Sequence, residues 1–457
     1  MDNLSSKKLS NCKLIKGDSG GCAFSVLCYN PLTPWFLRGI FYVIQRITLI
    51  KKWKFLYNLN TCMLKNEDII CISWLVWDSI PLVMHQMMTR LAVNNRVLFV
   101  DPPVAYSNMI IRPSLWKDRL KKTFLWLRGV RRVNDTLSVY YPPPLLLQYG
   151  HLKTVDKLNQ SFMASAIART ARGLGFTNPI VWIYHPYAIN PGGEFHEKLV
   201  CYDCNDDVGF FFCYHFNKRN RLSGIEEKLA KRADVVFATS KYLYRIRKEQ
   251  NPNTHYLPSG VDTELFQQAR SADCKIAPEL EGIPCPVIGF VGGMVNSKMH
   301  WEWIRDAAAA KPQWNFVFVG PCVENPPPYI AQQKNIFFVG TRPQNLLPSY
   351  IKGFDVCLIP YQGEDFLRAC QPTKAFEYLA SGKPVVSSWI PELEEYQEVI
   401  RLSRTSKEFI RNIEAALDEG KKEELAQKYI QAAQGWTWEG RMEKASEIII
   451  RTLKKHE

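Results

Sequence analysis

From residue 68 onward, short apolar runs alternate with polar or mixed segments long enough for helices. The first series of predicted strands covers residues 69–75, 96–100, 180–184, 199–202 and 234–238. These runs are too uniformly apolar for a sheet with one face in water, so we expect a sheet covered on both faces. Segments 81–93 and 158–171 between them predict helices, and this alternation indicates parallel βαβ units.

The series of strands then starts again. The second set covers residues 287–291, 315–319, 335–339, 355–359 and 384–387. A turn at 257–262 and a polar stretch up to Pro286 separate the two sets, and such stretches are typical of domain boundaries. Helices are predicted near 421–433 and 438–454. The sequence therefore predicts an α/β protein with two doubly wound, Rossmann-like domains that face each other across a cleft.

We assign four regions from these patterns. They are an N-terminal extension over 1–67, a first domain over 68–262, a second domain over 263–435 and a C-terminal helix over 436–457. In the extension, residues 34–50 are rich in aromatic and aliphatic side chains, and Lys51, Lys52 and Lys54 follow. An amphipathic helix on a membrane surface and a packing arm of the first domain both fit this pattern.

Composition narrows the picture only in part. The formal charge of +14 predicts attraction to anions, which include nucleotide phosphates, nucleic acid and anionic membranes. The 13 cysteines have no disulfide-like spacing, which is typical of a reducing compartment. A single Cys-x-x-Cys at 201–204 has no second pair, so we expect no zinc site. The sequence also shows no signal peptide and no uncharged apolar stretch of 18 residues.

Ligands of doubly wound sheets bind beyond the carboxyl ends of the strands. The loop after residues 287–291 contains Gly292 and Gly293, which let a backbone approach a ligand closely, and Lys298, which suits a diphosphate. We expect a helix to begin near Lys298 and to direct its N-terminus at the ligand. A plain tight turn with a solvated lysine fits the same residues.

A more specific pattern covers residues 371–386. A helix that carries Thr373, Lys374 and Glu377 ends at a glycine and passes through Lys-Pro into a strand. A carboxylate there suits two ribose hydroxyls. The alternative is a surface glutamate paired with Lys374, three positions earlier.

The 371–386 segment resembles the donor-site helix of glycosyltransferase family 4. Residues 290–299 are similar to the family's glycine-arginine-x(4)-lysine loop, and 257–262 to its Asn-Gly-Val-Asp turn, with Ser259 in place of asparagine. Segments 97–103 and 202–207 resemble a bacterial subgroup that includes teichuronic acid biosynthesis transferases. The resemblance extends over about residues 68–455.

This resemblance implies a GT-B fold, with an acceptor domain first, a nucleotide-sugar domain second and a final helix that crosses back to the first. The implied catalytic residues are His185, Lys298 and Glu377. We expect the donor-binding residues to be Gly292, Gly293, Lys298, Arg368, Thr373, Lys374 and Glu377. On the acceptor side we expect Trp77, Asp78, Asp206 and Asp207.

Two positions depart from the family pattern. Gly293 stands where the family has its phosphate-binding arginine, and Ala369 stands where it has the first of two glutamates. Arg368 is a candidate replacement for the cation, and Glu364 or Asp365 for the carboxylate.

A basic and aromatic segment covers 116–132. It contains seven Lys or Arg residues against one aspartate, with Trp116, Phe124, Leu125 and Trp126 interleaved. An anionic membrane interface, nucleic acid and a solvated helix face all fit this composition. In an enzyme that glycosylates lipid-linked acceptors, the membrane fits best.

The sequence as a whole predicts a cytoplasmic glycosyltransferase, with membrane association on the inner face left open. It would transfer a sugar, as a hexosyltransferase, from a nucleotide-sugar to a cell-surface polysaccharide or lipid-linked acceptor, without metal, cofactor or nucleic acid. The alternatives are a nucleotide-sugar epimerase of the same fold and a non-catalytic nucleotide- or sugar-binding scaffold.

Overall fold

The computed structural model describes residues 63–79, 81–104, 124–145, 153–186, 193–207 and 219–456. The chain forms two compact units. Residues 260–437 make the second domain, and the described residues before them together with the C-terminal helix from residue 438 make the first. Each domain is described by itself below.

The first domain is built on an eight-stranded sheet with the order β3-β4-β2-β1-β5-β6-β7-β8. Neighbouring strands are parallel except for the antiparallel pair β3 and β4. The strands are β1 (Asp68–Ile72), β2 (Arg96–Val100), β3 (Val130–Arg132), β4 (Leu137–Tyr140), β5 (Ile180–Ile183), β6 (Leu199–Cys204), β7 (Val235–Ala238) and β8 (Thr254–Tyr256).

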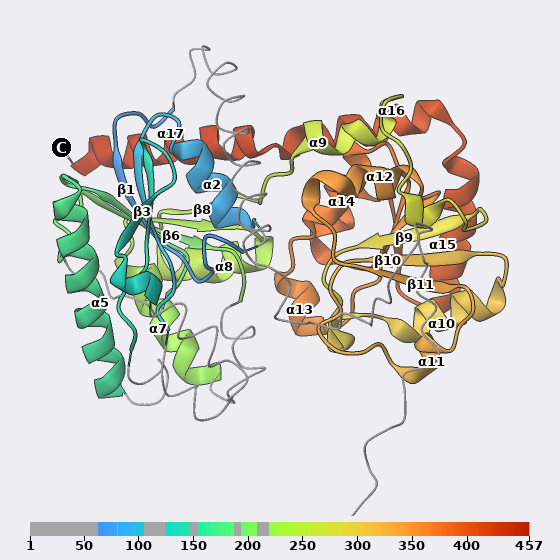
Figure 1. The fold of residues 1–457 in the computed structure, drawn as a ribbon, viewed down its shortest axis with the longest axis horizontal. Coiled ribbons are helices and arrows are strands. Elements are labelled where there is room, and N and C mark those ends of the chain that lie inside the picture. The colour runs from blue at the N-terminus through green and yellow to red at the C-terminus, as the bar shows by residue number, and fades with distance from the viewer. Residues whose placement is uncertain are drawn as a thin grey trace, which may run out of the picture. The chain divides into compact units, whose positions relative to one another are not determined.

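Alternate residues of these strands face two separate cores. Ile69 and Cys71 of β1 belong to one core, and Ile70 and Ile72 belong to the other. Helices α2 (Val83–Leu91) and α17 (Trp438–His456) supply apolar side chains to the first core (Figure 1). Helices α5 (Lys153–Gly173), α7 (Arg219–Arg232) and α8 (Lys241–Gln250) cover the opposite face. The two-sided burial explains why the strands read as continuous apolar runs.

A buried ion pair attaches α17 to this sheet. Arg441 Nη2 donates to both carboxylate oxygens of Asp203 on β6, at 2.8 and 2.9 Å, and both side chains are almost fully buried. The indole of Trp182 also donates to Asp203. Arg441 Nη1 donates to the backbone carbonyls of Leu257 and Pro258. These bonds pair both Nη atoms of Arg441, whereas its buried Nε has no hydrogen-bond partner among the described residues. Pairing with an opposite charge is what makes a buried charge tolerable.

The second domain contains a six-stranded parallel sheet with the order β11-β10-β9-β12-β13-β14. Its strands are β9 (Val287–Val291), β10 (Asn315–Val319), β11 (Ile336–Gly340), β12 (Val356–Ile359), β13 (Val385–Ser388) and β14 (Ile400–Ser403). Its helices are α9 (Thr263–Gln267), α10 (Trp301–Ala310), α11 (Pro328–Ala331), α12 (Leu347–Lys352), α13 (Glu364–Ala369), α14 (Thr373–Ala380), α15 (Ser406–Glu419) and α16 (Glu423–Ala433).

The strand order of the second domain reverses at β9. Its successor β10 lies on one side, and β12 lies on the other. In open α/β sheets such a reversal opens a ligand site beyond the carboxyl end of the strand. The loop after Val291 lies at this point, so the topology directs the search for a site there.

One predicted helix start is wrong. Helix α10 begins at Trp301, and residues Asn296–Lys298 form a separate 3₁₀ turn. Lys298 is therefore the last residue of that turn and does not lie at the N-terminus of α10. Across the described residues, no helix is long and apolar enough to span a bilayer.

Candidate active site

The loop after β9 is shaped by close backbone contacts. Gly292 has φ of +153°, and a Cβ on Gly320, at the end of β10, would lie 2.0 Å from the Gly292 carbonyl oxygen. A Cβ on Gly292 would itself lie 2.2 Å from Cε of Lys374. Side chains are thus excluded from both glycines, and the Lys374 chain lies directly against the loop.

Lys374, on the first turn of α14, is a partly buried cation at this loop. Burial pulls the pKa of Lys374 down, but the Tyr361 hydroxyl and the Glu377 carboxylate outweigh that effect and raise its pKa above the ordinary value. The ammonium therefore stays protonated near neutral pH, beside a loop whose backbone approaches any bound ligand. This is the arrangement expected at a phosphate site.

Helix α14 is fixed to the end of β9 by Tyr378. The Val291 backbone N–H donates to the Tyr378 hydroxyl oxygen at 2.8 Å, and that hydroxyl lies 3.4 Å from the Val291 carbonyl oxygen. Tyr378 is fully buried, whereas its neighbour Glu377 is only partly buried. The same helical turn thus anchors the helix and presents a carboxylate.

Glu377 lies between a positive and a negative group. Burial raises the pKa of Glu377, the nearby Lys374 lowers it and Asp262 raises it again, with a net increase. Asp262 also caps α9, because its carboxylate accepts from the Leu265 backbone N–H at 3.1 Å. Asp262 belongs to the turn that resembled the family's Asn-Gly-Val-Asp motif. The structure brings this turn to Glu377.

Lys298 takes a different position. Its Nζ lies 4.4 Å from the centre of the Phe366 ring on α13, a cation–π distance. The Gln362 backbone N–H donates to the Lys298 carbonyl at 3.0 Å. Lys298 is therefore attached to the segment that follows β12, whereas Lys374 lies against Gly292.

The other donor-side residues occupy α13, the start of α14 and the glycine loop. Arg368 forms an ion pair with Asp365, one helical turn earlier, at 2.5 Å. Ala369 is buried, so no carboxylate occupies the position of the family's first glutamate. Thr373 is the first residue of α14. Gly293 is exposed, and no described atom lies within 4 Å of where its Cβ would be.

His185 lies two residues after the end of β5 and is partly buried. Burial lowers its pKa to about 4, so the imidazole is neutral at pH 7. A neutral ring offers one donor and one acceptor nitrogen. It does not act as a permanent cation.

The four residues expected on the acceptor side differ in their surroundings. Trp77 is a core residue with 1% exposure, packed edge-to-face on Phe99, so its ring cannot contact an acceptor. Asp78 pairs with Arg131 at 2.9 Å. Asp206 and Asp207 follow β6 and are partly exposed.

Sequence reasoning missed a buried network beneath these two aspartates. Tyr202 donates its hydroxyl hydrogen to Glu226, and Arg247 pairs with Glu226 at 2.6 Å. Burial raises the pKa of Glu226, and the charge of Asp207 contributes in the same direction. Because Glu226 and Arg247 lie on separate helices, no sequence spacing indicates the network.

No group of three or more His, Cys, Asp or Glu side chains in the described parts of the chain is placed to hold a metal ion.

Known proteins share both the sequence pattern and the fold. Residues 285–432 match the family of glycosyl transferases group 1. TuaH of Bacillus subtilis, which is assigned to teichuronic acid biosynthesis as a glycosyltransferase, is 30% identical over 212 residues. That match covers 44% of this chain and 52% of TuaH, so the chain spans about half the length of this curated relative.

Solved structures extend the likeness over most of the chain. Sucrose-phosphate synthase from Thermosynechococcus elongatus covers 85% of this chain and 100% of its own, at a TM-score of 0.60 and 15% identity. HepE of Anabaena, solved with UDP and glucose, has a TM-score of 0.56 and 15% identity, and the match covers 84% of this chain and 99% of HepE. The trehalose-6-phosphate synthase OtsA has a TM-score of 0.58 and 12% identity, and the match covers 85% of this chain and 99% of OtsA. The chain thus has the GT-B fold, and its residues 285–432 match the glycosyl transferases group 1 family.

Proposed function

We propose that the chain is a nucleotide-sugar-dependent glycosyltransferase of the hexosyltransferase type. The observation that carries this proposal is the cradle formed by Gly292, Lys374 and Glu377 at the carboxyl end of β9. It combines a close backbone approach, a partly buried cation and a carboxylate at the point where the strand order reverses. The family match over the same residues supports transfer rather than epimerisation.

The cradle suggests a role for each group. Backbone N–H groups of the glycine loop and the Lys374 ammonium would hold the diphosphate and stabilise the charge that develops on the leaving group. Glu377 would accept hydrogen bonds from the ribose hydroxyls. Neutral His185 would hydrogen-bond the transferred sugar. We expect no metal ion in this scheme, because a lysine and backbone donors supply the positive potential.

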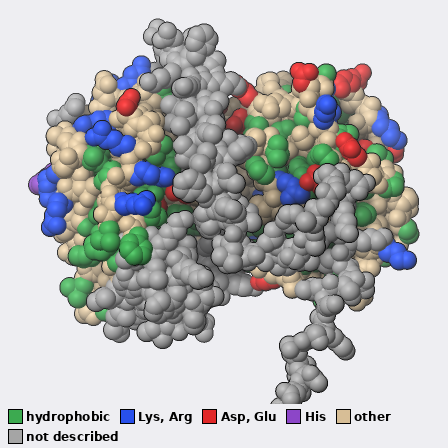
Figure 2. All heavy atoms as spheres, in the orientation of Figure 1, with side chains coloured by type: hydrophobic (Ala, Val, Ile, Leu, Met, Phe, Trp, Pro, Cys, Tyr) green, Lys and Arg blue, Asp and Glu red, His purple; other side chains and the backbone are tan. Residues whose placement is uncertain are grey.

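The acceptor is proposed from TuaH and from the surface of the first domain. TuaH is assigned to teichuronic acid biosynthesis, which favours a cell-surface polysaccharide or its lipid-linked precursor as the acceptor. A lipid-linked acceptor would place the enzyme on the inner face of the cell membrane, as a peripheral protein. Figure 2 shows Lys and Arg side chains beside a cluster of hydrophobic side chains on the first domain.

The exposed hydrophobic residues of the first domain support such a surface. Residues 124–127, inside the basic and aromatic segment, are helical, and Phe124 and Leu127 are each about two thirds exposed. On α5, Leu158 and Phe162 lie one turn apart and are also exposed. Residues 105–123 of the chain lie outside the described residues.

Turnover of a donor panel tests the function. The full chain is incubated with UDP-glucose, the ligand in a HepE complex, and with other UDP-, GDP- and dTDP-hexoses, in the presence of membrane lipid extract. We expect one donor to give nucleoside diphosphate and a glycosylated acceptor. Glu377→Gln serves as the inactive control. Release of free sugar or an epimer without a glycosylated product would contradict the proposal.

A further inference from the structure

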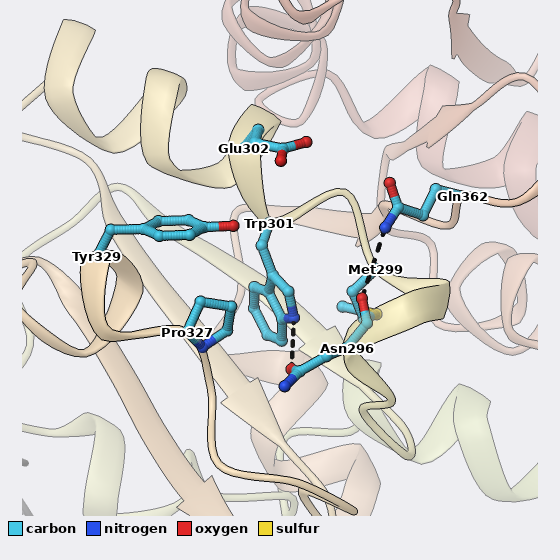
Figure 3. A pocket seen from close by; sticks show the side chains of 7 residues that line it. All are labelled: Asn296, Met299, Trp301, Glu302, Pro327, Tyr329 and Gln362. Atoms are coloured by element: carbon cyan, nitrogen blue, oxygen red, sulfur yellow. Dashed lines mark hydrogen bonds between the residues drawn. The ribbon is translucent and has the colours of Figure 1, made fainter.

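A pocket of about 150 Å³ opens in the second domain, on loops that follow three neighbouring strands. We call it the Tyr329 pocket and define it by Trp301, Glu302, Pro327, Tyr329 and Gln362 (Figure 3). Trp301 and Glu302 begin α10 after β9, Pro327 and Tyr329 follow β10, and Gln362 follows β12. None of these residues belongs to the Gly292–Lys374–Glu377 cradle.

Rigid apolar surfaces form one side of the pocket. Trp301 is almost fully buried, packs against Phe318 at a centroid distance of 5.3 Å and donates its indole N–H to Asn296 Oδ1 at 2.9 Å. Tyr329, by contrast, is 36% exposed. Figure 3 shows its ring beside Pro327, with the hydroxyl directed toward Trp301. Aromatic rings of this kind pair an apolar face with a polar edge.

The polar groups around the pocket are mostly acceptors. The side-chain amide nitrogen of Gln362 donates to the Asn296 backbone carbonyl at 3.5 Å, so the side-chain oxygen of Gln362 is directed away from Asn296, as Figure 3 shows. Arg305, one turn along α10 from Trp301, pairs with Asp306 at 2.7 Å, and its guanidinium carbon lies 5.6 Å from the centre of the Tyr329 ring. The Glu302 carboxylate lies at the rim and is exposed. A ligand that suits these groups carries several hydroxyl donors around an apolar ring face.

Size limits the ligand further. A volume of about 150 Å³ equals the share of about five waters at roughly 30 Å³ each. Sites for drug-sized ligands measure about 300–1,000 Å³. The Tyr329 pocket is therefore too small for a nucleotide-sugar and fits a single sugar ring.

We propose that the Tyr329 pocket is a saccharide site for one neutral sugar residue, separate from the donor cradle. The sugar would pack against Pro327 and the exposed part of the Tyr329 ring, beside Arg305, and its hydroxyls would donate to Glu302 and Gln362. The proposal goes beyond the transferase function and does not depend on it, because every group it uses lies outside the cradle.

Saturation-transfer NMR on the full chain tests the site. The probes are methyl glucoside, methyl galactoside and N-acetylglucosamine, each measured alone and with saturating UDP. We expect saturation transfer to at least one sugar, and we expect it to persist with UDP. Tyr329→Ala should weaken binding of that sugar by about tenfold or more. Glu302→Ala should weaken it by about tenfold, the effect of one charge-assisted hydrogen bond. Tyr329→Phe keeps the ring and should retain most of the affinity.

Matched variants distinguish binding in the Tyr329 pocket from binding elsewhere on the chain. Val323→Ala removes an exposed side chain from the segment between β10 and α11 and should leave sugar binding unchanged. Thermal unfolding shows whether each variant folds. The proposal is overturned if no sugar of the panel binds, if UDP displaces the sugar, or if Tyr329→Ala binds it as well as the original chain does. If UDP, GDP and dTDP all fail to bind, the transferase proposal fails, while the Tyr329 comparison still decides the sugar site.

Discussion

At the scale of single residues, two lysines are candidates for the diphosphate cation, and the structure gives them different surroundings. Lys374 lies against Gly292, whereas Lys298 lies over Phe366. We predict that Lys374→Met weakens binding of UDP by about ten- to a hundredfold, because one charge-assisted contact is worth roughly 1.5–3 kcal/mol. Lys298→Met should weaken it less. Methionine keeps most of the packed stem and removes the charge.

Calorimetry with UDP and uridine makes the comparison specific. Uridine lacks the diphosphate, so its affinity should be the same in Lys374→Met and in the original chain. Lys334→Met, an exposed lysine of the same domain, is the matched control and should change neither affinity. A larger loss in Lys298→Met than in Lys374→Met would show that the sequence-based assignment of Lys298 was the better one.

Gly293 allows the opposite experiment, which is to restore a charge. The position is exposed, and the space around its absent Cβ is open among the described atoms. We predict that Gly293→Arg in the Lys374→Met background recovers part of the lost UDP affinity, about tenfold, because a guanidinium can contact phosphate oxygens bidentately. Gly293→Gln is the uncharged control. Equal recovery in both variants would exclude a charge effect.

His185 provides a prediction on pH. Its pKa of about 4 in the folded chain lies below the ordinary value of about 6.5, so the unfolded chain binds this proton more tightly between the two values. His185 therefore lowers the free energy of unfolding as the pH falls from about 6.5 to 4. We predict that His185→Gln loses less stability than the original chain between pH 7 and pH 5 in urea unfolding. Parallel pH curves would contradict the neutral state of the folded imidazole.

At the scale of elements, the strands were predictable and the ligand loops were less so. Five of the six strands of the second domain were predicted from apolar runs, and the observed β9 matches the predicted 287–291. The sixth, β14, reads Ile-Arg-Leu-Ser and was not predicted, because it alternates apolar and polar residues. The start of α10 was not predictable in the same way, because the 3₁₀ turn at Asn296–Lys298 depends on hydrogen bonds to distant residues. Asn296 N–H donates to Glu324, and Gln362 N–H donates to the Lys298 carbonyl.

The candidate site shows the same division. Glu377 and Lys374 were found from one local motif. The contact of Lys374 with Gly292, and the influence of Asp262 on Glu377, arise only when three separate segments fold together. Trp77 was expected on the acceptor side, yet its ring fills the core. Position after a strand fixes where a backbone lies and leaves the direction of the side chain open.

The attachment of α17 is testable at the same scale. Arg441→Ala would leave the Asp203 carboxylate buried without its partner, and such losses cost about 3–5 kcal/mol. We predict a decrease of this size in the unfolding free energy of the first domain, measured by denaturant titration. Arg451→Ala removes an exposed arginine from the same helix and should stay within about 0.5 kcal/mol of the original chain. Equal stability of both variants would mean that apolar packing alone holds α17.

At the scale of the whole molecule, the charge of +14 and the exposed hydrophobic residues of the first domain both bear on the proposed membrane binding. Arg131 already pairs with Asp78, so part of the basic segment is neutralised within the protein. Residues 1–62 and 105–123 lie outside the described residues, and with them much of the predicted membrane-binding sequence. The described part contributes Phe124, Leu127, Leu158 and Phe162, which sequence patterns alone had not singled out as a set.

We predict that the full chain sediments with phosphatidylglycerol vesicles and is partly released at high salt. Salt weakens the attraction between exposed charges, and at 0.1 M this attraction is largely screened beyond about 10 Å. Phe124→Ser with Leu127→Ser should reduce binding at every salt concentration, because buried apolar area contributes about 25 cal/mol per Å² independently of salt. Leu158→Ser with Phe162→Ser tests α5 in the same way. Ile276→Ser, an exposed apolar residue of the second domain, is the control and should have no effect. Equal sedimentation with neutral phosphatidylcholine vesicles would contradict the electrostatic part of this prediction. Unchanged binding of both double variants would contradict the apolar part, and the membrane contact would then belong to other regions of the chain.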